Sequence, residues 1–137
     1  MKRKIISFFT VILTVLLTTC LMVGCKKDAV KLDGDYVVIT ATADADGKTL
    51  LAFMEQLKEK DELRFEMSDG MVVSIDGKQN ASDFSSCWML YTSDSENANN
   101  AWGIVEYDGK EYGSATFGAE QLIVKEGAIY IWWYQTF

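Results

Sequence analysis

The chain contains no histidine among its 137 residues. Histidine is the commonest general base and the usual partner of nucleophilic serine and cysteine, so both kinds of nucleophile pair are excluded. An ordinary zinc site also lacks its usual ligands. The remaining catalytic alternative is a pair of carboxylates, but the spacing of Asp and Glu in the sequence selects no pair. We therefore expect a protein that is not an enzyme.

Cysteine is scarce as well, with Cys20, Cys25 and Cys87 as the three examples. The first two belong to the N-terminal segment discussed below, which leaves Cys87 alone in an exported domain and excludes an internal disulfide. A single thiol in an apolar strand is typical of a small buried hydrophobic side chain. A reactive thiol is the alternative.

The N-terminus has the order of a secretory signal. Residues 2–4 are basic and residues 5–23 carry no charge, as in the basic and apolar parts of a signal peptide. The apolar segment is about long enough to span a bilayer, so an uncleaved anchor is the alternative.

The end of this segment favours cleavage. Residues 21–25, LMVGC, resemble the lipobox of bacterial lipoproteins, in which the signal is cut after a small residue and before a lipid-bearing cysteine. Gly24 is small, whereas Cys20 follows Thr19 and fits less well. We expect residues 1–24 to be a lipoprotein signal peptide and Cys25 to be lipidated. The protein would then be anchored to the cell membrane on its extracytoplasmic face.

Basic residues are few in the mature chain. Without residues 2–4 the net charge changes from −7 to about −10, with ten Lys and Arg against 20 Asp and Glu. Such a domain repels phosphate backbones, which argues against nucleic acid as a partner. It also argues against electrostatic binding to anionic lipid, so the lipid on Cys25 would be the membrane contact.

Residues 25–34 are expected to be the lipidated cysteine and a charged tether, and residues 35–137 one small domain. Residues 49–59 predict a helix, with Thr49 as N-cap. Its apolar residues recur at the spacing of a single buried stripe. The stripe consists of Leu50, Phe53, Met54 and Leu57.

The rest of the domain is rich in strands. Residues 36–43, 63–67, 71–75 and 87–91 are rich in apolar and β-branched residues, and residues 103–117 form a hairpin pattern around Asp108-Gly109. The apolar run at 128–135 suits a central strand covered on both faces, with Trp132 and Trp133 pointing to opposite sides. We predict an α+β fold, with one helix packed on a mostly antiparallel sheet.

Asp44 and Asp46, in one short segment, are weak candidate metal ligands. Residues 42–47, TADADG, resemble half of an EF-hand loop in which Asp44 and Asp46 take the third and fifth positions. Thr42 and Phe53 then occupy the first and twelfth positions, where the motif needs acidic ligands. We therefore expect a turn here, and no metal site beyond these weak candidates.

The segment from 93 to 102 is the candidate binding site. Aromatic rings beside amide-rich loops offer apolar area together with hydrogen-bond donors and acceptors. The alternatives are a solvated loop and, for Trp102, core packing, which is the fate expected of Trp88. The predicted ligand-binding residues are Ser93, Asp94, Asn97, Asn99, Asn100 and Trp102.

Four motifs in order resemble the transcobalamin-like C-terminal domain family. They are Thr49-Leu50-Leu51, Val72 to Gly77, Trp88 to Tyr91, and Gly127 to Tyr134. The resemblance implies a β-grasp-like fold and cobalamin or another corrinoid as the ligand. In the vitamin carriers this domain closes over cobalamin together with a separate helical domain, for which this chain has no room.

The chain also departs from the family. It has Ser93-Asp94-Ser95 where the family often has Asn-Gly, Gly127-Ala128 where the family has Gly-Asp, and an added hairpin at 103–117. The expected function is a lipid-anchored extracytoplasmic binding domain for cobalamin, another corrinoid or another small ligand. The partner would be such a small molecule or a surface or transport protein. The alternative is a cell-surface module that binds a protein or a glycan.

Overall fold

The computed structural model describes residues 28–137. The predicted signal peptide at residues 1–24 and the predicted lipidation site at Cys25 lie outside the described residues. Within residues 28–137, no helix has both the length and the apolar character needed to cross a bilayer.

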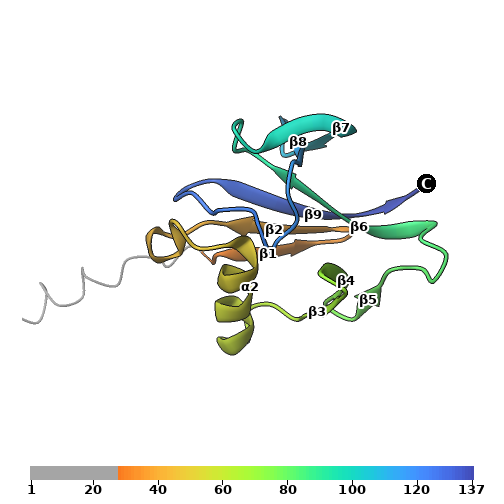
Figure 1. Ribbon diagram of the computed structural model, residues 1–137, viewed down its shortest axis with the longest axis horizontal. Helices are drawn as coiled ribbons and strands as arrows, with labels where there is room; N and C mark the ends of the chain where they lie inside the picture. Colours follow the sequence, from red (N-terminus) through yellow and green to blue (C-terminus); the bar gives the residue numbers. More distant parts are fainter. Residues whose placement is uncertain (1–27) are drawn as a thin grey trace, which may run out of the picture.

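A six-stranded antiparallel sheet forms the centre of the domain (Figure 1). Its order is β1 (Val30–Asp33), β2 (Tyr36–Thr40), β9 (Ile129–Thr136), β6 (Ser86–Thr92), β8 (Lys110–Ala115) and β7 (Ala98–Tyr107). The predicted central strand is β9, which pairs with β2 on one side and β6 on the other. This position explains its continuous apolar sequence, because both of its faces are covered.

Strand β1 differs from the sequence prediction, which placed residues 25–34 in a tether. Its four residues pair with β2, from Val30 opposite Ile39 to Asp33 opposite Tyr36. Gly34 makes the turn between the two strands with a φ of 62°, a conformation that glycine adopts without steric cost. The short sequence VKLD lacks the apolar run that identified the other strands.

One face of the sheet is covered by α2 (Leu50–Glu59) and a small sheet of β3 (Phe65–Ser68), β4 (Met71–Ile75) and β5 (Lys78–Gln79). Thr49 caps the helix by accepting a hydrogen bond from the backbone N–H of Ala52 at 3.1 Å. The predicted helix and its buried stripe are confirmed. Trp88 and Trp132 pack in the same apolar cluster as this stripe, as do Val37 and Ile39 of β2.

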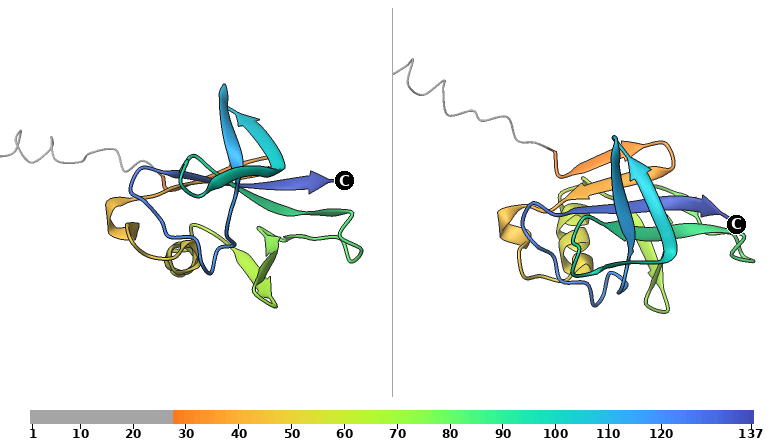
Figure 2. Two further views of the ribbon diagram at one scale, coloured as in Figure 1. Left: turned by 45° about the horizontal axis from the view of Figure 1, so that its top comes forward. Right: turned by 90° about the horizontal axis from the view of Figure 1, so that it is seen from above.

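The β7–β8 hairpin lies over the opposite face of the sheet, above β9 in Figure 1 and across β9 in the right view of Figure 2. Strand β8 joins β6 through two residue pairs, Tyr91 with Ser114 and Thr92 with Gly113. Beyond them the hairpin leaves the plane of the sheet and packs a second apolar cluster against it. The members of this cluster are Val38, Tyr91, Val105, Tyr112 and Ile131, with Trp133 partly buried against them.

The described residues therefore form one small domain, with nine strands and one α-helix. Trp132 and Trp133 lie in clusters on opposite faces of the sheet, as their adjacency predicts. Because residues between 28 and 137 form both clusters, we expect a fragment of this range to fold by itself.

Candidate functional site

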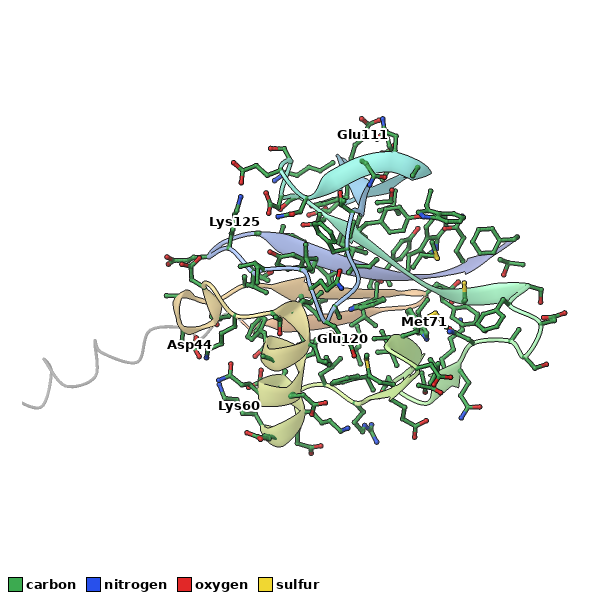
Figure 3. All side chains as sticks on the ribbon, viewed as in Figure 1. Asp44, Lys60, Met71, Glu111, Glu120 and Lys125 are labelled. Carbon is green, nitrogen blue, oxygen red and sulfur yellow. The ribbon has the colours of Figure 1, made fainter. Side chains whose placement is uncertain are left out.

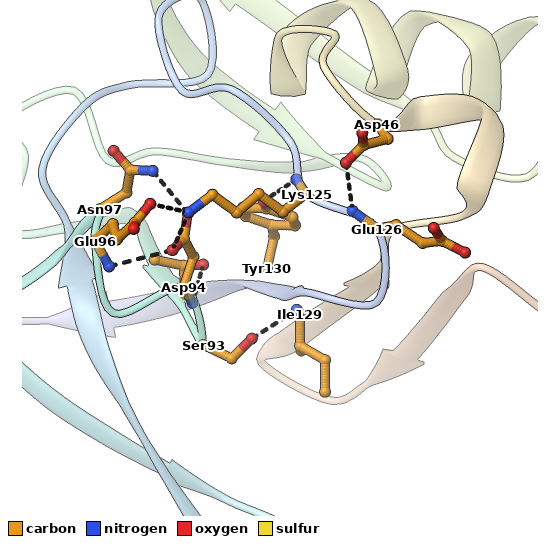
Figure 4. Close-up of polar contacts among 10 residues, drawn as sticks. Asp46, Ser93, Asp94, Glu96, Asn97, Lys125, Glu126, Ile129 and Tyr130 are labelled. Carbon is orange, nitrogen blue, oxygen red and sulfur yellow. Dashed lines mark hydrogen bonds and ion pairs between the residues drawn. The ribbon is translucent and has the colours of Figure 1, made fainter.

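The predicted loop is organised around the carboxylate of Asp94 (Figure 4). Asp94 is only 8% exposed. It accepts hydrogen bonds from the Asn97 side-chain amide at 2.7 Å and from the Glu96 backbone N–H at 3.2 Å. Lys125 completes the cluster, with its Nζ 3.1 Å from Asp94 Oδ1 and in direct contact with the Glu96 carboxylate. The side chains of Asp94 and Asn97 therefore have hydrogen-bond partners within the protein.

The electrostatic balance keeps Asp94 charged. Burial acts to raise the pKa of Asp94, but the hydrogen bonds from Asn97 and Lys125 and from the Glu96 backbone outweigh it and lower the pKa below its ordinary value. The contacts with Glu96 and Asp94 raise the pKa of Lys125. The cluster is therefore an internal ion pair at neutral pH.

Two more of the predicted ligand-binding side chains also have structural partners. Ser93 Oγ accepts a hydrogen bond from the Ile129 backbone N–H at 2.9 Å. Asn99 Oδ1 accepts from the Ala101 backbone N–H at 2.8 Å and from Ser114 Oγ at 2.9 Å. The structure thus gives Ser93, Asp94, Asn97 and Asn99 roles in holding the backbone.

Asn100 and Trp102 remain open to solvent. Both lie in a bulge of β7, because strand pairing with β8 is interrupted between Asn99 and Ile104. Trp102 is 63% exposed and Ile104 48%, so the predicted choice between core and surface for Trp102 is decided for the surface. Its backbone is held in place by Ser114 Oγ at 3.3 Å and by the Tyr91 hydroxyl, also at 3.3 Å.

A cleft lies elsewhere, between the hairpin and the sheet. It has a volume of about 670 Å³. Val38, Thr40 and Ile129 line it from the sheet, and Tyr107, Lys110 and Tyr112 line it from the hairpin. None of the six predicted ligand-binding side chains lines this cleft. The cleft was missed because the sequence predicts the hairpin but not its folding over the sheet.

A cluster of side chains joins the tip of the hairpin to β1 beside the cleft. The Tyr107 hydroxyl donates a hydrogen bond to Asp33 Oδ2 at 2.9 Å, and Lys31 Nζ lies 3.4 Å from the same oxygen. The rings of Tyr107 and Tyr36 are 5.4 Å apart. The bonds from Tyr107 and Lys31 lower the pKa of Asp33. These contacts hold the hairpin over the sheet.

The weak metal candidates have local partners. Asp44 Oδ1 accepts a hydrogen bond from Thr42 Oγ1 at 2.6 Å, and Asp46 Oδ1 accepts from the Glu126 backbone N–H at 2.9 Å. In the part of the chain that the structure describes, no three His, Cys, Asp or Glu side chains gather as a metal site. Figure 3 shows Asp44 and Glu111 at separate places on the fold.

Cys87 is free and half-buried in β6, on the hairpin side of the sheet. Burial raises the pKa of its thiol, which lowers the fraction of reactive thiolate. Its Sγ lies 3.8 Å from the sulfur of Met89. The side chain is less buried than the sequence suggested.

Comparison with known proteins identifies no matching family model, no similar curated protein and no similar solved structure. The resemblance to the transcobalamin-like family therefore stays a prediction, which rests on the four sequence motifs.

Proposed function

We propose that this protein is a lipid-anchored, extracytoplasmic, non-enzymatic binding domain that receives a small ligand in the cleft beneath the β7–β8 hairpin. The cleft itself is the observation that carries the proposal. Its volume of about 670 Å³ falls within the range of about 300–1,000 Å³ typical of small-molecule sites. Apolar side chains from the sheet meet a few polar groups from the hairpin, which is the usual composition of such sites.

The corrinoid ligand and the β-grasp-like relationship belong to this proposal through the sequence resemblance. Cobalamin is the ligand to test first. Because four of the six predicted ligand-binding side chains have structural partners, we assign only the other two to cobalamin. Asn100 and Trp102 keep exposed side chains and could meet a bulky ligand at the outer face of the hairpin.

The first experiment titrates the fragment of residues 26–137 with cyanocobalamin and follows tryptophan fluorescence. We expect saturable quenching, because Trp133 is half-buried beneath the hairpin and Trp102 is exposed on it. Free N-acetyltryptophanamide corrects for light absorbed by the ligand. A Thr40→Tyr variant, which fills the cleft, should abolish the saturable part. If no saturable change occurs up to high micromolar ligand, the corrinoid is excluded and the general binding proposal remains.

The anchor is tested separately. We expect Cys25→Ser to prevent lipidation and to move the protein from the membrane fraction to the soluble fraction of its native cells. Mass spectrometry of the wild-type protein should find lipid-modified Cys25 as the first residue. A mature chain that still begins with residues 1–24 would contradict the lipoprotein and favour the uncleaved anchor.

A second candidate function is a surface module that binds a protein or a glycan. The exposed pair Trp102 and Ile104 favours it, because large exposed apolar side chains mark interaction surfaces when they lie together. Such a partner would be recognised on the outer face of β7, whereas a small ligand would enter the cleft. The two functions therefore differ in the cleft residues, which only the small ligand would contact.

A further inference from the structure

The side chain of Tyr112 lines the cleft and is almost wholly buried, with only 3% of its surface exposed. Its hydroxyl takes part in none of the hydrogen bonds among the described residues, and this oxygen keeps contact with solvent. The hydroxyl is therefore open to a partner that enters the cleft. Burial, together with nearby Asp108, raises the pKa of Tyr112, so the hydroxyl keeps its proton and is available as a hydrogen-bond donor.

Lys110 lines the same cleft. It precedes Tyr112 by two residues in β8 and so points to the same side of the hairpin. No carboxylate of the described residues forms a salt bridge with Lys110, whereas Lys31 across the cleft pairs with Asp33. Lys110 and Tyr112 together offer one positive charge and one hydroxyl donor to a ligand.

The opposite wall of the cleft is apolar. Val38 of β2 and Ile129 of β9 lie on the sheet face that the hairpin covers. A ring or a short alkyl chain would remove apolar surface from water there, at about 25 cal/mol per Å² buried. Asp28 and Asp108 also line the cleft but are exposed to solvent, where water screens their charge.

From this arrangement we propose that the cleft binds an amphipathic organic anion. Its apolar body packs on Val38 and Ile129, and its carboxylate or sulfonate contacts the Lys110 ammonium and the Tyr112 hydroxyl. This inference rests on the proposed small-molecule cleft, independently of the corrinoid, and names the chemical class of a ligand for that cleft.

Two fluorescent probes of similar shape test the anion directly. The probe 8-anilinonaphthalene-1-sulfonate has an aromatic body and a sulfonate, and N-phenyl-1-naphthylamine has the body alone. We expect the 26–137 fragment to bind the sulfonate probe more tightly. Lys110→Met and Tyr112→Phe should each weaken the sulfonate probe about fivefold to tenfold, as expected for a hydrogen bond to a charged group. Neither substitution should change the affinity of the neutral probe.

Three variants serve as controls. Thr40→Tyr should abolish the binding of both probes, because it fills the cleft. Asp108→Asn should not weaken the sulfonate probe, and Trp102→Ser removes binding to the exposed outer surface.

The outcomes distinguish a failure of the anionic ligand class from a failure of the cleft as a binding site. If Lys110→Met and Tyr112→Phe affect both probes equally or neither, the anion inference is overturned while the cleft remains a binding site. If Thr40→Tyr blocks neither probe, or neither probe binds, the cleft itself and the proposed function fail.

Discussion

Replacing Gly113 by alanine is expected to lower the free energy of unfolding by about 2 kcal/mol, the usual cost of adding a methyl group where no space exists. A Cβ at this position would lie 2.8 Å from the backbone oxygen of Asn99 and 3.1 Å from the Cβ of Ala98. Backbone atoms cannot yield as the end of a flexible side chain does. Urea denaturation followed by tryptophan fluorescence measures the loss.

At low denaturant concentration, the Gly113→Ala substitution should destabilise the β7–β8 hairpin more than the rest of the sheet. Gly113 pairs with Thr92 of β6 and Ile104 of β7, so it lies where the hairpin leaves the sheet and where the β7 bulge begins. Hydrogen exchange of the amides in β7 and β8 should accelerate more than exchange in β9. Gly118→Ala is the matched control, because nothing lies within 4 Å of its added Cβ. Equal stability of the two variants would contradict the proposed packing.

The parts of the fold that depend on local pattern could be predicted from the sequence. The stripe of α2 follows helical spacing, and the Asp-Gly pairs at 76–77 and 108–109 both adopt positive φ at both residues, as the turns of tight hairpins require. The α+β class and the opposite faces of Trp132 and Trp133 followed from the same reasoning. Strand β1 did not, because only its pairing with β2 makes its four residues a strand.

The candidate site was harder to predict, because its contacts join distant residues. The sequence around Asp94 and Asn97 would look the same whether these side chains bind a ligand or hold a loop. In the structure both side chains hold the loop, and one of the contacts comes from Lys125, 31 residues away. The cleft depends on the hairpin crossing over the sheet, which brings Tyr107 to Asp33 over 74 residues. No periodic signal marks such a contact.

Substituting Asp94 by asparagine is expected to destabilise the domain by about 2 kcal/mol at pH 7, because the buried carboxylate is the charged hydrogen-bond acceptor for Asn97 and Lys125. The amide would present a second donor to Asn97 and no charge to Lys125. Urea denaturation at pH 7 measures this difference. Asp28→Asn is the control, since Asp28 is exposed and its side chain forms none of the hydrogen bonds or salt bridges among the described residues, and it should change stability little.

The pH dependence distinguishes the ion pair from simple packing. The folded state lowers the pKa of Asp94 below the ordinary value of 3.8, so the unfolded chain takes up its proton first as the pH falls. The stability contributed by the charge is therefore fully present above the unfolded pKa and is lost as the pH falls through the folded pKa. The difference between wild type and Asp94→Asn should shrink between pH 5 and pH 3, as judged from urea midpoints. If the difference stays constant over this range, the carboxylate charge does not organise the loop.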